Sequence, residues 1–149
     1  MSTIMRKMNV ISRCESIYRT RHLEEDFPGI YHSYILTISR KPGMTQEWLA
    51  RHLCVNKSSV TRHLVKLEKE GYIERRVCED DKRELLVYPT EKMLGIREEV
   101  VRITKEWNSL LFEGLTEEEM TIFGNIMEKL TDKSMEIIYG EKSANENNP

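Results

Sequence analysis

The sequence predicts a mainly α-helical fold with one small β-hairpin. Over most of the chain, apolar residues recur every three or four positions, which is the spacing of amphipathic helices. The exception is residues 72–88, where two short strand-like runs flank the polar segment CEDDKRE. Two short helix patterns precede this hairpin, so residues 44–90 have the element order of a winged helix-turn-helix.

Four helices are predicted before the hairpin. Apolar spacing places the first over residues 4–23 and the second over residues 31–39, and a segment containing Pro-Gly ends each of them. Thr45 is the expected N-cap of the third helix and Asn56 that of the fourth, because their side-chain oxygens can accept from free backbone N–H groups. The residues that the fourth helix is expected to bury, at i, i+4 and i+7, are Val60, Leu64 and Leu67.

The hairpin is followed by two long helices. Gly71 lies where the end of the fourth helix favours a left-handed residue, and strands are expected over residues 72–77 and 85–88. Helical spacing returns over residues 91–112. Thr116-Glu-Glu-Glu119 then forms the capping-box pattern that predicts the start of the last helix.

Charge is unevenly distributed along the chain. The formal net charge is −2, but residues 51–78 contain seven basic and three acidic side chains, whereas residues 91–149 contain seven basic and thirteen acidic ones. A basic segment in an otherwise acidic protein suits contact with phosphate groups through one face of the molecule.

The fourth helix carries the main candidates for contact with DNA. Its outward face presents short hydroxyl side chains, which let a helix lie deep in the major groove, together with several cations. Arg62 is the best candidate for a base contact, because its guanidinium can pair with two acceptors on guanine. The predicted contacts in this helix are Lys57, Ser58, Ser59, Thr61, Arg62 and Lys66, with Lys57 and Lys66 expected on phosphates. For any one of them, an ordinary solvated helix face is the alternative.

The hairpin supplies a second set of candidate DNA contacts. Lys82 and Arg83 lie at its predicted tip, and arginine suits the narrow minor groove, where negative potential is concentrated. Asp81 lies two residues before Arg83 and is expected to hold its guanidinium. A solvated charged turn is the alternative interpretation of this segment.

The long outer helices predict a homodimer. The first, fifth and sixth helices are amphipathic, and the small winged module cannot cover all of their apolar faces. We therefore expect residues 1–28 and 91–140 to form a helical dimerisation region and residues 29–90 to form the winged helix-turn-helix DNA-binding domain. Residues 141–149 are expected to be a disordered tail.

The chain resembles the MarR family of bacterial and archaeal transcriptional regulators. The wing of that family has the pattern Asp-x-Arg, five residues and Leu-Thr, which is matched here by Asp81, Lys82 and Arg83, five residues, and Pro89-Thr90. The segment NKSSVTRHLVKLEKEGYIERR resembles the recognition helix and first wing strand of the family, and LTEEE at residues 115–119 resembles the start of its last helix. Pro89 replaces the usual leucine, and because it has no N–H the second strand must end there or lie at an edge.

The resemblance implies a homodimeric transcriptional regulator, usually a repressor of a palindromic operator in double-stranded DNA, that a small aromatic or anionic effector releases. It also implies that Arg83 enters the minor groove with support from Asp81. For the effector, the sequence offers Tyr31, His32 and Tyr34 in the second helix and Arg13, Arg19 and Arg21 in the first. Core tyrosines and surface arginines are the alternative, so no effector-binding residue is assigned.

The three cysteines, Cys14, Cys54 and Cys78, form no CxxC pair, so neither a disulfide framework nor a zinc finger is expected. Some relatives sense peroxide through a cysteine of the first helix, which makes a redox-responsive regulator using Cys14 an alternative. Because free cysteine is often buried, Cys14 and Cys54 are instead expected to be buried and Cys78 to lie at the wing edge. The four histidines form no i, i+4 pair, and the sequence indicates no metal and no cofactor.

Other classes of function have little support in the sequence. No Gly-rich phosphate loop, HExxH or GxSxG motif occurs, so an enzyme is not expected. Winged helices also serve as protein-interaction modules, but the basic residues of the fourth helix and hairpin favour DNA. No apolar run approaches the ~20 residues that span a bilayer, and the N-terminus lacks a signal-peptide core, so we expect a cytoplasmic protein.

Overall fold

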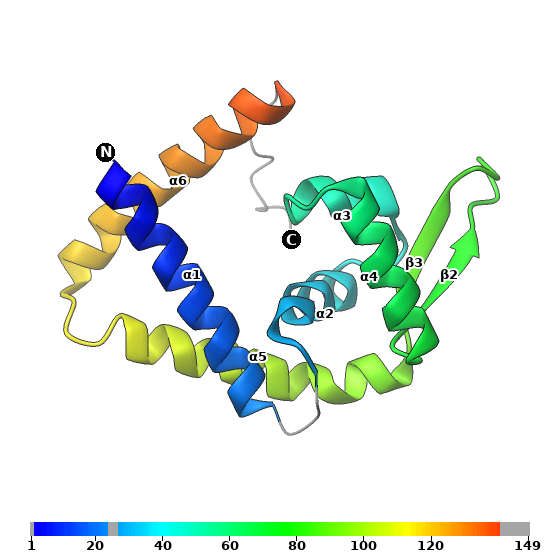
Figure 1. Cartoon of the computed structure of the whole chain (residues 1–149), viewed down its shortest axis with the longest axis horizontal. Helices are drawn as coiled ribbons and strands as arrows, with labels where there is room; N and C mark the ends of the chain where they lie inside the picture. Colours follow the sequence, from blue (N-terminus) through cyan, green and yellow to red (C-terminus); the bar gives the residue numbers. More distant parts are fainter. Residues whose placement is uncertain (1, 24–26, 141–149) are drawn as a thin grey trace. The chain divides into compact units, whose positions relative to one another are not determined.

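The fold is mainly α-helical with one small sheet, as the sequence predicts. The computed structural model describes residues 2–23 and 27–140 (Figure 1). The chain separates into two compact units, residues 1–108 and 109–149. In chain order the elements are α1 (Ser2–His22), a 3₁₀ turn (Gly29–Tyr31), α2 (His32–Arg40), β1 (Met44–Thr45), α3 (Gln46–His52), α4 (Lys57–Lys69), β2 (Ile73–Val77), β3 (Leu85–Pro89), α5 (Glu91–Leu111) and α6 (Glu117–Tyr139). The predicted tail, residues 141–149, lies outside the described residues.

The ends of α3 and α4 are set by the residues that the sequence singles out. The Thr45 hydroxyl accepts a hydrogen bond of 3.1 Å from the backbone N–H of Trp48, and the Asn56 side chain accepts one of 2.8 Å from that of Ser59. Each bond satisfies an N–H group that the first turn of a helix leaves free. Gly71 follows α4 with φ 82°, a left-handed value that glycine adopts without strain. Both predicted helices are therefore confirmed.

The core of the first unit buries one face of α4. Val60, Leu64 and Leu67 are each 0% exposed, as their spacing predicts. They belong to one apolar cluster whose other members include Ile35, Ile38, Leu49, Val87, Met93, Val100 and Ile103. Because this face is buried, the opposite face of α4 is fixed toward solvent.

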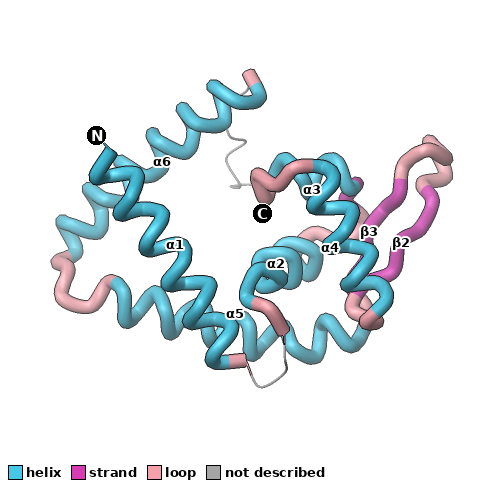
Figure 2. The backbone as a smooth tube through the Cα atoms, viewed as in Figure 1, coloured by secondary structure: helices cyan, strands magenta, loops and turns pink. Residues whose placement is uncertain are grey.

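A three-stranded antiparallel sheet with the order β1-β3-β2 attaches the hairpin to the helices of the first unit. The pairs run from Ile73–Pro89 to Val77–Leu85 between β2 and β3, and are Met44–Val87 and Thr45–Leu86 between β1 and β3. Pro89 is the last residue of β3, as expected of a residue without an N–H. We call β2, β3 and the connecting residues 78–84 the wing, which projects beyond the helices of this unit (Figure 2).

The C-terminal end of α1 packs closely on the rest of the first unit. The rings of Tyr18 and of Trp107 in α5 lie 5.3 Å apart between centroids, and the Gly29 N–H donates to the Thr20 hydroxyl at 2.8 Å. A Cβ atom at Gly29 would lie 2.5 Å from the carbonyl oxygen of Ser16, so only glycine allows this approach. Elsewhere on α1, several apolar residues are 43–59% exposed, namely Ile4, Met5, Val10, Ile11 and Ile17.

The second unit contains α6, a capped helix with no buried residue. Thr116 and Glu119 form the predicted capping box through hydrogen bonds of 2.9 and 3.2 Å. Gly140 ends the helix in a left-handed conformation with φ 69°. The apolar residues of α6 that are 42–70% exposed are Ile122, Phe123, Ile126, Leu130, Ile137 and Ile138. We call these six residues the apolar face of α6.

Candidate nucleic-acid interface

The outward face of α4 brings together all six predicted contacts of that helix. Lys57, Ser58, Thr61, Arg62 and Lys66 are exposed, and Ser59 is half-buried. Five of the six lie within the first six residues of α4. In helix-turn-helix proteins, the N-terminal residues of the recognition helix are the ones that contact base edges.

All six side chains have partners within the protein, and those of Lys57 and Arg62 matter most for their availability. Lys57 Nζ lies 2.9 Å from Glu47 Oε1 of α3, and the hydrogen bond from Lys57 lowers the pKa of the Glu47 carboxyl. Both side chains are more than 60% exposed, and exposed ion pairs contribute little to stability. Lys57 can therefore exchange Glu47 for a phosphate at small cost. Arg62 donates to the Ser59 hydroxyl at 3.2 Å, which leaves most of its guanidinium donors available.

Asp81 holds Arg83 in the wing, as the sequence predicts. Arg83 Nε and Nη2 donate to the two Asp81 carboxylate oxygens at 3.1 and 3.3 Å, and the Arg83 backbone N–H donates to Asp81 at 3.0 Å. These hydrogen bonds lower the pKa of the Asp81 carboxyl. The Arg83 side chain nevertheless remains 91% exposed, so its guanidinium is oriented but accessible. Lys82 beside it is also exposed.

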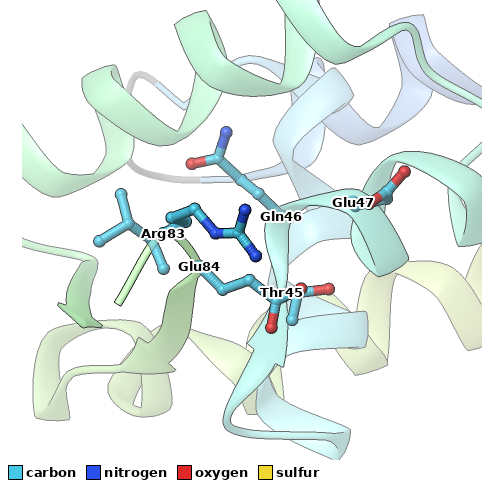
Figure 3. A pocket seen from close by; sticks show the side chains of 6 residues that line it. Thr45, Gln46, Glu47, Arg83 and Glu84 are labelled. Atoms are coloured by element: carbon cyan, nitrogen blue, oxygen red, sulfur yellow. The ribbon is translucent and has the colours of Figure 1, made fainter. Parts of the chain in front are cut away.

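A shallow pocket of about 200 Å³ lies where the wing meets the start of α3 (Figure 3). The residues that line it are Thr45, Gln46, Glu47, Arg83, Glu84 and Leu85. Arg83 of the wing and Glu47, the partner of Lys57, therefore lie at the same pocket. Gln46 and Glu47 of this pocket contact Thr61 and Lys57 of α4, so α3 lies between Arg83 of the wing and the outward face of α4.

Two residues that sequence reasoning missed also lie at this surface. Gln46 donates to the Thr61 hydroxyl at 2.9 Å and accepts from Arg75 of β2 at 3.4 Å. Because these partners lie 15 and 29 positions away, no local pattern marks Gln46. Val65 is 47% exposed on α4. The sequence marks Val65 only as an apolar residue that lies outside the buried i, i+4, i+7 stripe of α4.

The three aromatic residues considered for an effector belong to the core of the first unit. Tyr31, His32 and Tyr34 are 6%, 0% and 1% exposed. The Tyr34 hydroxyl is hydrogen-bonded to Nδ1 of His63 in α4 at a distance of 2.8 Å. Burial raises the pKa of Tyr34 to about 12 and lowers that of His63. The hydrogen bond therefore joins two neutral groups and links α2 to α4.

The three arginines considered with them lie on α1. Arg13 and Arg21 are exposed, whereas Arg19 is half-buried and forms an ion pair with Glu15. The burial of the tyrosines and the exposure of Arg13 and Arg21 correspond to the alternative of core tyrosines and surface arginines.

His32 is expected to make stability depend on pH. Neither of its ring nitrogens has a hydrogen-bond partner among the residues that the structure describes. Burial, with the charge of Arg19, lowers its pKa from the usual 6.5 to about 4. Between these values the unfolded chain binds the proton and the folded one does not, so acid favours unfolding. We expect urea denaturation to show a loss of about 2 kcal/mol between pH 7 and pH 5 from this residue.

The matched variants are His32→Phe and His22→Gln. His32→Phe removes the titrating group and is expected to flatten the pH dependence, apart from the smaller contribution of the same sign from His63. His22→Gln replaces an exposed histidine and is the control for the removal of an imidazole. An unchanged slope in His32→Phe would refute the assignment.

The cysteines correct one prediction. Cys14 and Cys54 are exposed rather than buried, and Cys78 is half-buried. Cys54 lies in the turn between α3 and α4 with φ 51°, and its Sγ approaches the Arg51 carbonyl oxygen at 3.5 Å. Its neighbours Leu53 and Val55 pack against the core, whereas the Cys54 side chain is exposed. Cys14 lies on a stretch of α1 whose side chains are mostly exposed in the monomer.

Within the described ranges, no group of three or more His, Cys, Asp or Glu side chains is arranged to hold a metal ion. No helix in that part of the chain has the length and apolar character needed to cross a membrane.

Comparison with known proteins identifies relatives of the same architecture. Residues 32–85 match the model of the MarR family. The chain is 26% identical over 131 residues to the uncharacterized HTH-type transcriptional regulator YybA of Bacillus subtilis (strain 168), with 87% of each chain covered. It is 31% identical over 97 residues to the HTH-type transcriptional regulator BilQ of Clostridium symbiosum, which covers 65% of this chain and 67% of BilQ.

A solved structure shows the same fold. It is that of a Listeria monocytogenes protein, described as a MarR family transcriptional regulator, in complex with a 26mer DNA. The TM-score is 0.83 at 24% identity, with 94% of this chain and 97% of the other covered. The similarity extends over both the winged module and the flanking helices.

Proposed function

This chain belongs to the MarR family of winged helix-turn-helix transcriptional regulators, and we propose that it is a homodimeric repressor of a palindromic operator. The observation that carries the proposal is the outward face of α4, which presents hydroxyl and cationic side chains, together with the exposed Arg83 of the wing. The relatives YybA and BilQ are transcriptional regulators rather than enzymes, which agrees with this class of function.

We assign the contacts with double-stranded DNA to two elements. In the proposed complex α4 enters the major groove, where Arg62 pairs with guanine, while the wing places Arg83 in the minor groove. The proposed DNA-binding residues are Lys57, Ser58, Ser59, Thr61, Arg62, Lys66, Asp81, Lys82 and Arg83. The Listeria monocytogenes protein of the same fold is complexed with DNA, which supports this class of partner.

The proposed dimer forms through residues 1–28 and 91–140. The exposed apolar residues of α1 and the apolar face of α6 support this assignment, because large contiguous apolar surfaces mark interaction sites. Residues 29–90 are the proposed DNA-binding domain. As a regulator that acts on the genome, the protein is proposed to work in the cytoplasm.

We further propose that a small aromatic or anionic effector releases the protein from DNA. The hydrogen bond between Tyr34 and His63 supports this idea, because it connects α2 directly with the helix that would lie in the groove. Exposed Cys14 makes oxidation of its thiol a second candidate signal.

Selection of bound sequences from a random pool of duplex DNA tests the proposed function. We expect a palindrome whose half-sites lie about ten base pairs apart, and an affinity that falls steeply with salt. Arg62→Ala should cost roughly 1–3 kcal/mol and relax the preference for one base, whereas Arg83→Ala should weaken binding several-fold. Arg97→Ala, an exposed arginine of α5, is the control and should bind as wild type. If both interface variants bind as tightly as this control, the site assignment is wrong.

A further inference from the structure

The hydroxyl group of Thr61 is used inside the protein. It donates its hydrogen to the backbone carbonyl oxygen of Lys57 at 2.9 Å and accepts a hydrogen bond from Nε2 of Gln46 at 2.9 Å. A hydroxyl has one hydrogen, so Thr61 has none left to donate to a base or a phosphate while these bonds persist. This changes what the residue can present to DNA.

Residues at the base of the wing fix the direction of the Gln46 amide. Gln46 Oε1 accepts from Nη1 of Arg75, and a guanidinium has donors only, so the amide nitrogen must point toward Thr61. Arg75 is itself held by three hydrogen bonds of 3.0–3.1 Å to the Glu68 carboxylate, and its side chain is 17% exposed. Arg75 therefore donates both to Glu68 and to Gln46, and from Arg75 the hydrogen bonds run in one direction through Gln46 to the Thr61 hydroxyl.

These bonds leave Thr61 its methyl group and one acceptor lone pair of its hydroxyl oxygen. Thr61 is exposed, and Val65, one helical turn further on the same side of α4, is 47% exposed. Two neighbouring apolar groups thus lie on a helix surface that is otherwise polar and cationic. In the major groove, the C5-methyl of thymine is the apolar group on the base edges.

We propose that the methyl groups of Thr61 and Val65 read thymine through contact with its C5-methyl, with the Gln46–Thr61 hydrogen bond holding the hydroxyl away from the bases. The proposal rests on the proposed function, because it requires α4 to lie in the major groove. It assigns a specificity-determining role to Val65 and a positioning role to Gln46. It also gives Thr61 an apolar role in place of the polar one that the sequence suggested.

Replacing thymine by uracil in the selected operator tests the proposal directly. Uracil keeps the base pairing of thymine and lacks only the methyl group. One thymine per half-site is exchanged at a time, and the affinity of the wild-type protein is measured by fluorescence anisotropy. At the position facing Thr61 and Val65, we expect a loss of about fourfold for one half-site and about fifteenfold for both, the effect of leaving one or two methyl contacts unmade.

Matched variants separate the methyl from the hydroxyl. Thr61→Val keeps a methyl and removes the hydroxyl, so it should still distinguish thymine from uracil. Thr61→Ser keeps the hydroxyl with both of its hydrogen bonds and removes the methyl, so its discrimination should fall. Val65→Ala should reduce discrimination in the same way. Thermal unfolding of each variant shows that the protein under test is folded.

Failure of this inference is distinguishable from failure of the proposed function. If uracil is tolerated at every position while the operator is still bound in an Arg62-dependent manner, the thymine contact is refuted and the proposed function stands. If Thr61→Ser discriminates and Thr61→Val does not, the hydroxyl reads the base and the inference is overturned. If the wild-type protein selects no DNA sequence, the proposed function fails and the inference fails with it.

Discussion

Replacing Ile126 by aspartate is expected to leave the protein monomeric and to weaken operator binding by about a hundredfold or more. Ile126 belongs to the apolar face of α6 and is 50% exposed in the single chain. In a two-fold dimer formed through this face, the substitution places two carboxylates in an apolar interface, and each costs several kcal/mol when desolvated. The resulting monomer would bind one half-site alone. It would lose the affinity that a dimer gains by binding two half-sites at once.

Sedimentation velocity at a fixed protein concentration measures the oligomeric state, and an anisotropy titration measures the affinity for the operator. Asn125→Asp is the matched control, because it adds the same carboxylate at the adjacent exposed residue outside the apolar face. This control should remain a dimer of wild-type affinity. A dimeric Ile126→Asp protein that binds normally would show that α6 does not form the interface.

Leu64→Ala is expected to lower the free energy of unfolding by about 3 kcal/mol, because it leaves a cavity beneath α4. Leu64 is 0% exposed and lies between Val60 and Leu67 in the inward stripe of that helix. For a chain of this length, such a loss corresponds to a fall of about 10 °C in Tm. The loss of stability affects the helix that is proposed to enter the major groove. Operator binding by this variant should therefore be lost at a lower temperature than in the wild type.

Val65→Ala is the control for this prediction. It deletes two methyl groups from the next residue of the same helix, but that side chain is 47% exposed. Its effect on stability should therefore stay within about 0.5 kcal/mol. Urea denaturation followed by circular dichroism compares the two variants, and equal destabilisation would contradict the burial that distinguishes them.

The elements that the sequence predicts well are those with local chemical signals. Thr45 and Asn56 start helices because their own side chains accept hydrogen bonds three residues on, and Gly71 ends one because it can adopt a left-handed conformation. The contact between Asp81 and Arg83 spans only two residues and is equally local. Such features depend only on neighbouring residues, so they can be predicted from one amino-acid sequence.

The features that the sequence does not reveal depend on distant partners. β1 has two residues, Met44 and Thr45, too few to show an alternating pattern, and it exists because β3 lies beside it. The orientation of Gln46 depends on Thr61 and Arg75, which reach it only in the folded chain. The exposure of Cys54 likewise follows from the position of a turn in three dimensions and not from the residue type.

Thr45 has a consequence for how DNA would be deformed. It belongs to β1, where it pairs with Leu86 of the wing, and it is also the N-cap of α3, so the wing and the helix-turn-helix are joined without an intervening linker. In the bound state that we propose, any mismatch in shape between the protein and its operator would be accommodated mainly by the DNA, which would bend and change its groove width. Stretches that deform easily would then be favoured even at base pairs that no side chain touches.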